Sequence, residues 1–144
     1  KFIMQYAEFV QAILANVNNT SLTLRGPHYA GGPLPAEIGR LTQLTSLDVS
    51  RFRLTGEIPK EIRNLSRLTE IYMMSNQLSG EIPGDIGILS KLKILNLANN
   101  CLSGELPREI GCLSSLTSLD LSNNRLSGVI PREIETLSKL TSLQ

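Results

Sequence analysis

The side chains that could carry chemistry are few, and their spacing argues against catalysis. The single histidine, His28, has no cysteine or carboxylate at a spacing that suits a metal ion. Serines such as Ser79, Ser103 and Ser127 recur at one constant interval, so they belong to a repeated framework and not to a nucleophile–base pair. We therefore predict no catalytic residue, no metal site and no cofactor.

Three carboxylates could act as an acid–base pair if the repeated units stack on one another. Asp48 and Asp120 share a position on strands that are three apart, about 14 Å, whereas glycosidase carboxylates stand roughly 5 to 9.5 Å apart. Asp48 and Glu70 fall on adjacent strands at about 7–8 Å, and geometry does not exclude them. An open sheet has no pocket to desolvate them, so we predict ordinary solvated carboxylates.

Two kinds of side chain could be modified after synthesis. Asn18, Asn19 and Asn64 each begin an Asn-X-Ser/Thr sequon. Glycosylation requires a secretory route, and the repeat itself favours such residues around Asn64, so both explanations stay open. Cys101 and Cys112 fall at different corners of the expected coil, whereas a disulfide needs Cα atoms within about 7 Å. We predict two free thiols.

Length and charge restrict the class of protein further. A chain of 144 residues is long enough for one domain with a buried core. Its 14 basic and 13 acidic side chains leave a net charge of +1, which argues against a surface for nucleic acid or anionic lipid. No apolar run approaches the roughly 20 residues of a membrane span. We predict no nucleic-acid partner and no direct membrane contact in this segment.

One constant sequence period must position all of these side chains. Each unit reads L-x-x-L-x-x-L-x-L-x-x-N-x-L-x-G-x-I-P-x-x-I-x-x, and four copies fill residues 41–136. A constant period in this range marks a repeat array. The glycine and proline columns show the period most clearly: Gly56, Gly80, Gly104 and Gly128, with Pro59, Pro83, Pro107 and Pro131.

This pattern resembles the plant-type, 24-residue form of the leucine-rich repeat family, whose signature is G-x-I-P. The resemblance implies an α/β fold, a curved right-handed solenoid with a concave parallel β-sheet and short 3-10 turns on its convex side. It also implies a non-catalytic module that binds a protein or peptide, as in receptor ectodomains and polygalacturonase-inhibiting proteins. Such proteins work in the apoplast or at the cell surface.

The cysteine pairs usual in the end caps of extracellular members are not seen here. Their lack favours an alternative, a targeting domain of a larger enzyme such as a receptor kinase or a bacterial effector secreted into the host cytoplasm. The enzymatic domain would then lie outside this chain.

The ends of the chain depart from the regular repeat. Apolar residues in 1–17 recur at helical steps, which predicts an amphipathic helix that caps the first coil. Membrane binding is the alternative, but the stripe lacks the basic opposite face that such helices carry. Residues 18–40 form a degenerate first repeat with one extra residue, which we place in a bulge around Pro27, His28 and Tyr29. Residues 137–144 begin an incomplete fifth repeat, so we expect the natural protein to continue.

An asparagine column follows the expected strands at Asn76, Asn100 and Asn124. A buried side-chain amide can donate and accept hydrogen bonds at once. We therefore predict a structural asparagine ladder that joins successive turns. Phe52 takes this position in the first regular repeat, so the ladder starts late.

Strand positions that face away from the leucines define a candidate binding surface. Tyr72, Met74 and Ile94 are large side chains on a face that is otherwise small and polar, and we expect them to touch across adjacent strands. An apolar anchor with a polar rim is typical of binding surfaces, although a chance patch is the alternative. The predicted partner-binding residues are Asp48, Arg51, Glu70, Tyr72, Met74, Ile94, Asn96 and Asp120.

Overall fold

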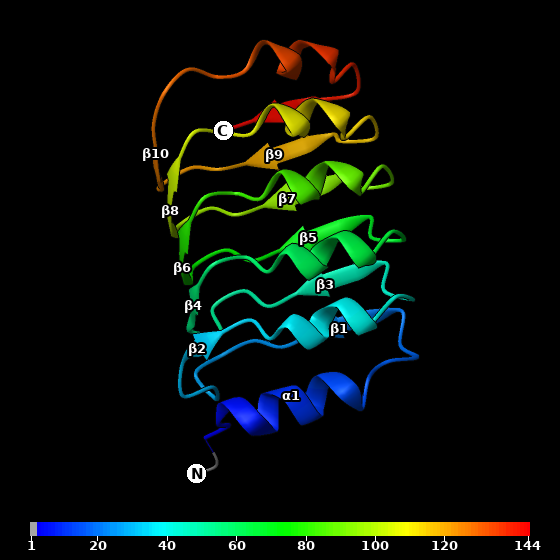
Figure 1. Ribbon diagram of the computed structural model, residues 1–144, viewed down its shortest axis with the longest axis vertical. Helices are drawn as coiled ribbons and strands as arrows, with labels where there is room; N and C mark the ends of the chain where they lie inside the picture. Colours follow the sequence, from blue (N-terminus) through cyan, green and yellow to red (C-terminus); the bar gives the residue numbers. More distant parts are fainter. Residues whose placement is uncertain (1–2) are drawn as a thin grey trace.

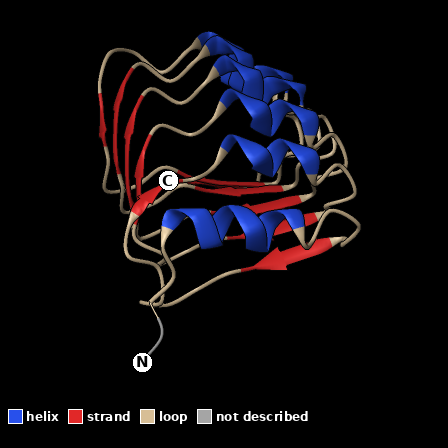
Figure 2. Cartoon of the chain, turned by 60° about the horizontal axis from the view of Figure 1, so that its bottom comes forward, coloured by secondary structure: helices blue, strands red, loops and turns tan. Residues whose placement is uncertain are grey.

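The computed structural model describes residues 3–144 and shows a solenoid of stacked coils (Figure 1). Each regular coil contributes one strand to a six-stranded sheet, one strand to a second sheet and one 3-10 helix. Figure 2 shows the helices in blue along one side of the solenoid and the strands in red in two groups, each on a side of its own. The predicted α/β leucine-rich repeat solenoid is confirmed.

The six-stranded sheet forms the concave side and is parallel throughout. Leu47 pairs with Ile71, Ile71 with Leu95 and Leu95 with Leu119, so residues one repeat apart in the sequence become neighbours in space. These four side chains are completely buried. Along the sheet the strands are β1 (Ser21–Thr23), β3 (Ser46–Asp48), β5 (Glu70–Tyr72), β7 (Ile94–Asn96), β9 (Ser118–Asp120) and β11 (Ser142–Leu143).

A second parallel sheet lies beside the first and was not predicted from the sequence. Its strands have only two to four residues, too few for an alternating apolar pattern to be visible. We call it the lateral sheet. In spatial order it contains β10 (Arg125–Leu126), β8 (Cys101–Gly104), β6 (Gln77–Gly80), β4 (Leu54–Gly56) and β2 (Gly32–Pro33).

The convex side carries the predicted short 3-10 helices. Each starts directly after a proline in the extended conformation; the proline ring limits the backbone there and its missing N–H leaves no donor unpaired at the helix start. Upstream, a glycine such as Gly80 adopts φ 73°, which other residues rarely do. The helices are η1 (Ala36–Arg40), η2 (Lys60–Asn64), η3 (Gly84–Ile88), η4 (Arg108–Cys112) and η5 (Arg132–Thr136).

An α-helix and an aromatic cluster close the N-terminal end of the core. Helix α1 (Tyr6–Leu14) is shorter than the predicted segment 1–17, and residues 1 and 2 lie outside the described range. Phe9 packs edge-on against the rings of Tyr29 and Phe52, with centroids 4.9 and 5.2 Å away. Tyr29 and Phe52 stack at 5.2 Å. Because this aromatic cluster fills the position of the first ladder asparagine, the ladder starts one repeat later.

The degenerate first repeat contains one extra residue, as the sequence indicated. Ser46 pairs with Glu70 at the regular repeat interval, whereas the interval from Ser21 to its partner Ser46 is longer by one position. The insertion lies in the loop between β1 and β2, which turns at Pro27 and His28. The loop carries Tyr29 into the aromatic cluster, so the irregularity serves to cap the core.

Candidate functional site

The concave face is built from rows of residues that occupy the same place in successive repeats. One row comprises Asp48, Tyr72, Asn96 and Asp120, and we call it the exit row because each residue ends its strand. Three of the four accept a hydrogen bond on the side-chain oxygen from the N–H two residues later, at 3.0 to 3.1 Å. Tyr72 replaces this short acceptor with a large ring, so it is the one member of the row that does not accept this hydrogen bond.

A second row, at the start of the strands, consists mainly of threonines. The hydroxyl of Thr69 donates to the carbonyl of Thr45 at 3.0 Å, and that of Thr117 donates to the carbonyl of Lys93, also at 3.0 Å. Thr45 and Thr141 make the equivalent bonds. We call this the threonine row. Lys93 interrupts it.

A third row lies between these two and is made mostly of serine. It holds a serine on β1, β3, β9 and β11, but Glu70 on β5 and Ile94 on β7. Past the strand ends, Met74 stands where neighbouring repeats have Ser50, Ala98 and Ser122. The departures from the repeat therefore gather on two adjacent strands. We call this group the central patch, and it consists of Glu70, Tyr72, Met74, Lys93 and Ile94.

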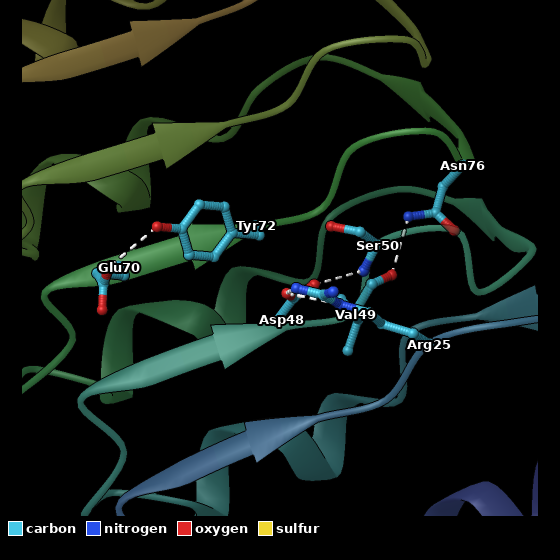
Figure 3. A network of polar contacts seen from close by, with 7 residues as sticks. All are labelled: Arg25, Asp48, Val49, Ser50, Glu70, Tyr72 and Asn76. Carbon is cyan, nitrogen blue, oxygen red and sulfur yellow. Dashed lines mark hydrogen bonds and ion pairs between the residues drawn. The ribbon is translucent and has the colours of Figure 1, made fainter.

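Strand register sets the geometry of the central patch. Glu70 lies directly opposite Ile94, and Tyr72 lies between Asp48 and Asn96. The hydroxyl of Tyr72 donates to Oε1 of Glu70 at 2.9 Å, so the ring runs back along β5 (Figure 3). Tyr72 and Ile94 are thus diagonal neighbours on β5 and β7. That their side chains touch stays a prediction.

The electrostatic surroundings of Tyr72 reflect this position. Its ring is half-buried. Burial raises the pKa of the Tyr72 hydroxyl, and the hydrogen bond to Glu70 and the charges of Glu70 and Asp48 raise it further. The hydroxyl therefore remains a hydrogen-bond donor at neutral pH and binds the Glu70 carboxylate through Oε1.

The prediction that Asp48 is an ordinary solvated carboxylate is wrong. Only 4% of it is exposed, and its Oδ2 accepts a hydrogen bond from Nε of Arg25 at 2.9 Å and forms an ion pair with the same guanidinium. Figure 3 shows Arg25 reaching across from the neighbouring coil to Asp48. Sequence reasoning missed Arg25 because it lies in the irregular first repeat, where the period no longer identifies neighbours.

The pKa of Asp48 depends on this arginine. Burial alone raises the pKa of the carboxyl, but hydrogen bonds from Arg25 and Ser50 and the charge of Arg25 outweigh burial and lower it below its usual value. A carboxyl with a lowered pKa stabilises the fold above its unfolded pKa of about 3.9. That stabilisation is lost as the pH falls through the folded value.

Replacing Arg25 with methionine is expected to raise the pKa of Asp48, because burial stays while the hydrogen bonds and charge of the arginine are lost. The variant should be less stable than the original chain at pH 7, and the difference should narrow below about pH 4. Denaturant unfolding at several pH values, with carboxyl NMR titration of Asp48, measures both effects. An unchanged Asp48 titration would contradict the pairing.

The asparagine ladder is present and structural. The side chain of Asn76 accepts from the N–H groups of Phe52 and Leu54 and donates to the carbonyls of Val49 and Met73, all at 2.9 to 3.0 Å. Asn100 and Asn124 make the same donations to carbonyls one and two coils later, but among the described residues each accepts from one N–H group only, those of Leu78 and Leu102.

The remaining predicted residues lie partly on the concave face and partly away from it. Arg51 is exposed and has φ 53°, and its N–H donates to the carbonyl of Met74 at 3.0 Å. Asn96 and Asp120 are half-buried members of the exit row. The three sequon asparagines are all exposed, at Asn18 and Asn19 after α1 and at Asn64 at the end of η2.

The two cysteines are free, as their positions in different elements suggested. Cys101 starts β8 and is half-buried, while Cys112 ends η4 and is exposed. Among residues 3–144, no group of three or more His, Cys, Asp and Glu side chains could hold a metal ion. Within the same range, no helix has the length and apolar character that crossing a bilayer requires.

Comparison with known proteins identifies the class to which this architecture belongs. One leucine rich repeat model matches residues 83–126, and a second matches residues 43–65 and 67–89. A search of curated protein sequences gave no match. Together with the solved structures described next, these matches show that the chain belongs to the leucine-rich repeat family, in its plant-type form.

Solved structures of plant receptors resemble the chain closely. PEPR1, solved with AtPEP1, is 34% identical with a TM-score of 0.82, over 85% of this chain and 17% of that chain. The ectodomain of the Arabidopsis receptor kinase HAESA, solved with an extended IDA peptide hormone, is 35% identical with a TM-score of 0.81, over 86% and 21%. A plant ice-binding protein is 31% identical with a TM-score of 0.75, over 84% and 42%. This chain therefore spans about a fifth of the length of the two receptor chains.

Proposed function

We propose that this chain is a non-catalytic recognition module that binds an extended peptide or protein segment across its concave sheet, at the central patch. One observation carries the proposal. The residues that depart from the exit row, the threonine row and the serine row lie together on β5 and β7 or directly before β7. Scattered departures would point to neutral drift, whereas a cluster on adjacent strands points to a shared ligand.

The departures also cost the fold local interactions, which strengthens the proposal. Tyr72 cannot accept the N–H that the other exit-row residues accept, and Lys93 has no hydroxyl for the threonine row. Positions where a chain departs from its own structural rule are expected at functional sites. An aromatic ring beside an isoleucine on an open face is the kind of anchor that dominates binding energy.

The receptor relatives support a peptide ligand, and their ectodomains support an extracellular location. A larger enzyme that uses this chain for targeting remains our second interpretation, since the chain spans only part of the relatives. Ice binding is the third, because one relative has that activity. We do not favour it, since the threonine hydroxyls are bonded to backbone carbonyls and Lys93 and Tyr72 break the regular array.

A groove elsewhere on the surface is a less selective candidate. It has a volume of about 610 Å³ and runs between the lateral sheet and the 3-10 helices, lined by Glu81, Pro83, Glu105 and Pro107, among others. These residues belong to the repeated Glu-Ile/Leu-Pro segment. The groove is therefore a by-product of the repeat, whereas the central patch occurs once.

The repeats themselves supply the variant that tests the proposal. Tyr72→Asn copies Asn96 and restores the exit-row acceptor, and Ile94→Ser copies Ser118. We expect the double variant to bind a cognate peptide at least about 2 kcal/mol more weakly, roughly thirtyfold, in calorimetry. Its melting temperature should stay within about 3 °C of the original. As a matched control on the convex side, Ile88→Ser should leave binding unchanged. Equal affinity of the double variant and the original chain would remove the site from this face.

A further inference from the structure

We propose that the central patch selects a peptide that carries a basic side chain, arginine in preference to lysine, and that this side chain pairs with Glu70. Its aliphatic stem packs between the ring of Tyr72 and Ile94. This inference deepens the proposed function and rests on it. It names the chemical class of the ligand, which a bare apolar anchor does not.

The Glu70 carboxylate forms no ion pair with another of the described residues. The ion pairs among residues 3–144 are Arg25–Asp48, Arg63–Asp85 and Arg108–Glu109, and none involves Glu70. The carboxylate is half-buried and accepts a hydrogen bond from Tyr72 on Oε1 at 2.9 Å. Oε2 accepts no hydrogen bond from another side chain of the described residues. The carboxylate therefore has one oxygen bonded to Tyr72 and keeps acceptor capacity on the other for a ligand.

The surroundings of Glu70 suit a long basic side chain. Ile94 lies directly opposite it on β7, Ser46 lies opposite it on β3, and the Tyr72 ring extends toward it from the same strand. A basic side chain covers apolar surface with its stem while its head reaches a carboxylate. A planar guanidinium also stacks on an aromatic ring, which an ammonium does less well. We therefore expect a peptide with arginine to bind more tightly than the same peptide with lysine.

The neighbouring charges leave Glu70 available. Figure 3 shows that Arg25 contacts Asp48 and lies apart from the Glu70–Tyr72 pair, so it does not neutralise Glu70. Lys93 is exposed directly before the adjacent strand β7, where its backbone N–H donates to the carbonyl of Thr69 at 2.8 Å, and its side chain forms no ion pair with Glu70. Lys93 is the competing influence, because it would favour an acidic ligand. Glu70 and Lys93 therefore favour ligands of opposite charge, and variants of each residue distinguish the two effects.

Panning a phage-displayed library of random peptides on the whole 144-residue chain tests the inference, with counter-selection on the Tyr72→Asn/Ile94→Ser variant. We expect the selected peptides to be enriched in arginine, and next in lysine, beside a large apolar residue. A selected peptide is then synthesised with its arginine or with citrulline, the neutral isostere. Citrulline should weaken binding about tenfold in calorimetry, as loss of one charged hydrogen-bonded pair does.

Matched variants of the protein assign that effect to Glu70. Glu70→Gln keeps an acceptor for Tyr72, and it should weaken the arginine peptide about tenfold while leaving the citrulline peptide unaffected. Lys93→Thr restores the threonine row, and it should bind the arginine peptide equally well or more tightly. If the changes in binding free energy caused by Glu70→Gln and by citrulline are not additive, the Glu70 carboxylate and the peptide guanidinium are in contact.

Three outcomes separate the inference from the function on which it rests. Peptides that need Tyr72 and Ile94 but show no basic preference, or no response to Glu70→Gln, overturn the inference and leave the binding face intact. Enrichment in acidic residues that disappears with Lys93→Thr overturns it in favour of Lys93. Failure to select any peptide sensitive to the double variant counts against the proposed function itself.

Discussion

Replacing Phe9 with alanine is expected to lower the free energy of unfolding by about 4 kcal/mol. Phe9 is completely buried and contacts both other rings of the aromatic cluster. Its loss opens a cavity between α1 and the first coil, because Tyr29 and Phe52 are held by their own strands and loops. For a chain of this size we expect the melting temperature to fall by roughly 10 °C in calorimetry.

Tyr6→Ala on the same helix is the control for this prediction. Tyr6 is 44% exposed, so we expect a change within about 1 kcal/mol. A fall of less than about 2 °C for Phe9→Ala would show that α1 does not cap the core as the structure has it.

Asn76→Ala should cost about 3 kcal/mol, the second largest effect. The substitution leaves the N–H groups of Phe52 and Leu54 without their acceptor and the carbonyl of Val49 without its donor, while the carbonyl of Met73 keeps the hydrogen bond from Asn100. These groups lie inside the solenoid, so water does not replace the lost bonds. Urea unfolding curves of the two proteins give the difference directly.

Asn124→Ala provides a graded comparison in the same ladder. Its amide accepts from one N–H group, that of Leu102, and the residue is only half-buried near the C-terminal end. Water reaches the freed groups there, so we expect a loss of about 1 kcal/mol. Equal losses at Asn76 and Asn124 would mean that burial does not set the strength of the ladder.

The sequence predicted those features that depend only on which residues become neighbours. A strict period places Leu47 beside Ile71 and Asn76 beside Asn100, and from this follow the concave sheet, the ladder and the positions of Tyr72 and Ile94. The structure confirms the fold that these neighbours imply. The binding role of the patch stays a prediction.

Features that depend on local backbone paths or on long side chains could not be predicted in this way. The lateral strands are too short to show a pattern, and Arg25 lies in the one repeat with an inserted residue. The threonine row was visible as a column, but its hydrogen bonds were not. Only these bonds show that Lys93 breaks a structural rule, which is why Lys93 was not among the predicted site residues.

Methyl NMR of the isotopically labelled chain tests the proposed binding face most directly, because each side of the solenoid has its own reporter. Ile94 and Met74 lie on the concave side, Ile88 is exposed on the convex side, and Ile130 is exposed beyond the lateral sheet. On titration with a selected peptide, we predict shifts of the Ile94 and Met74 methyl signals and constant signals from Ile88 and Ile130. Shifts at Ile88 or Ile130 with an unmoved Ile94 would contradict binding at the central patch.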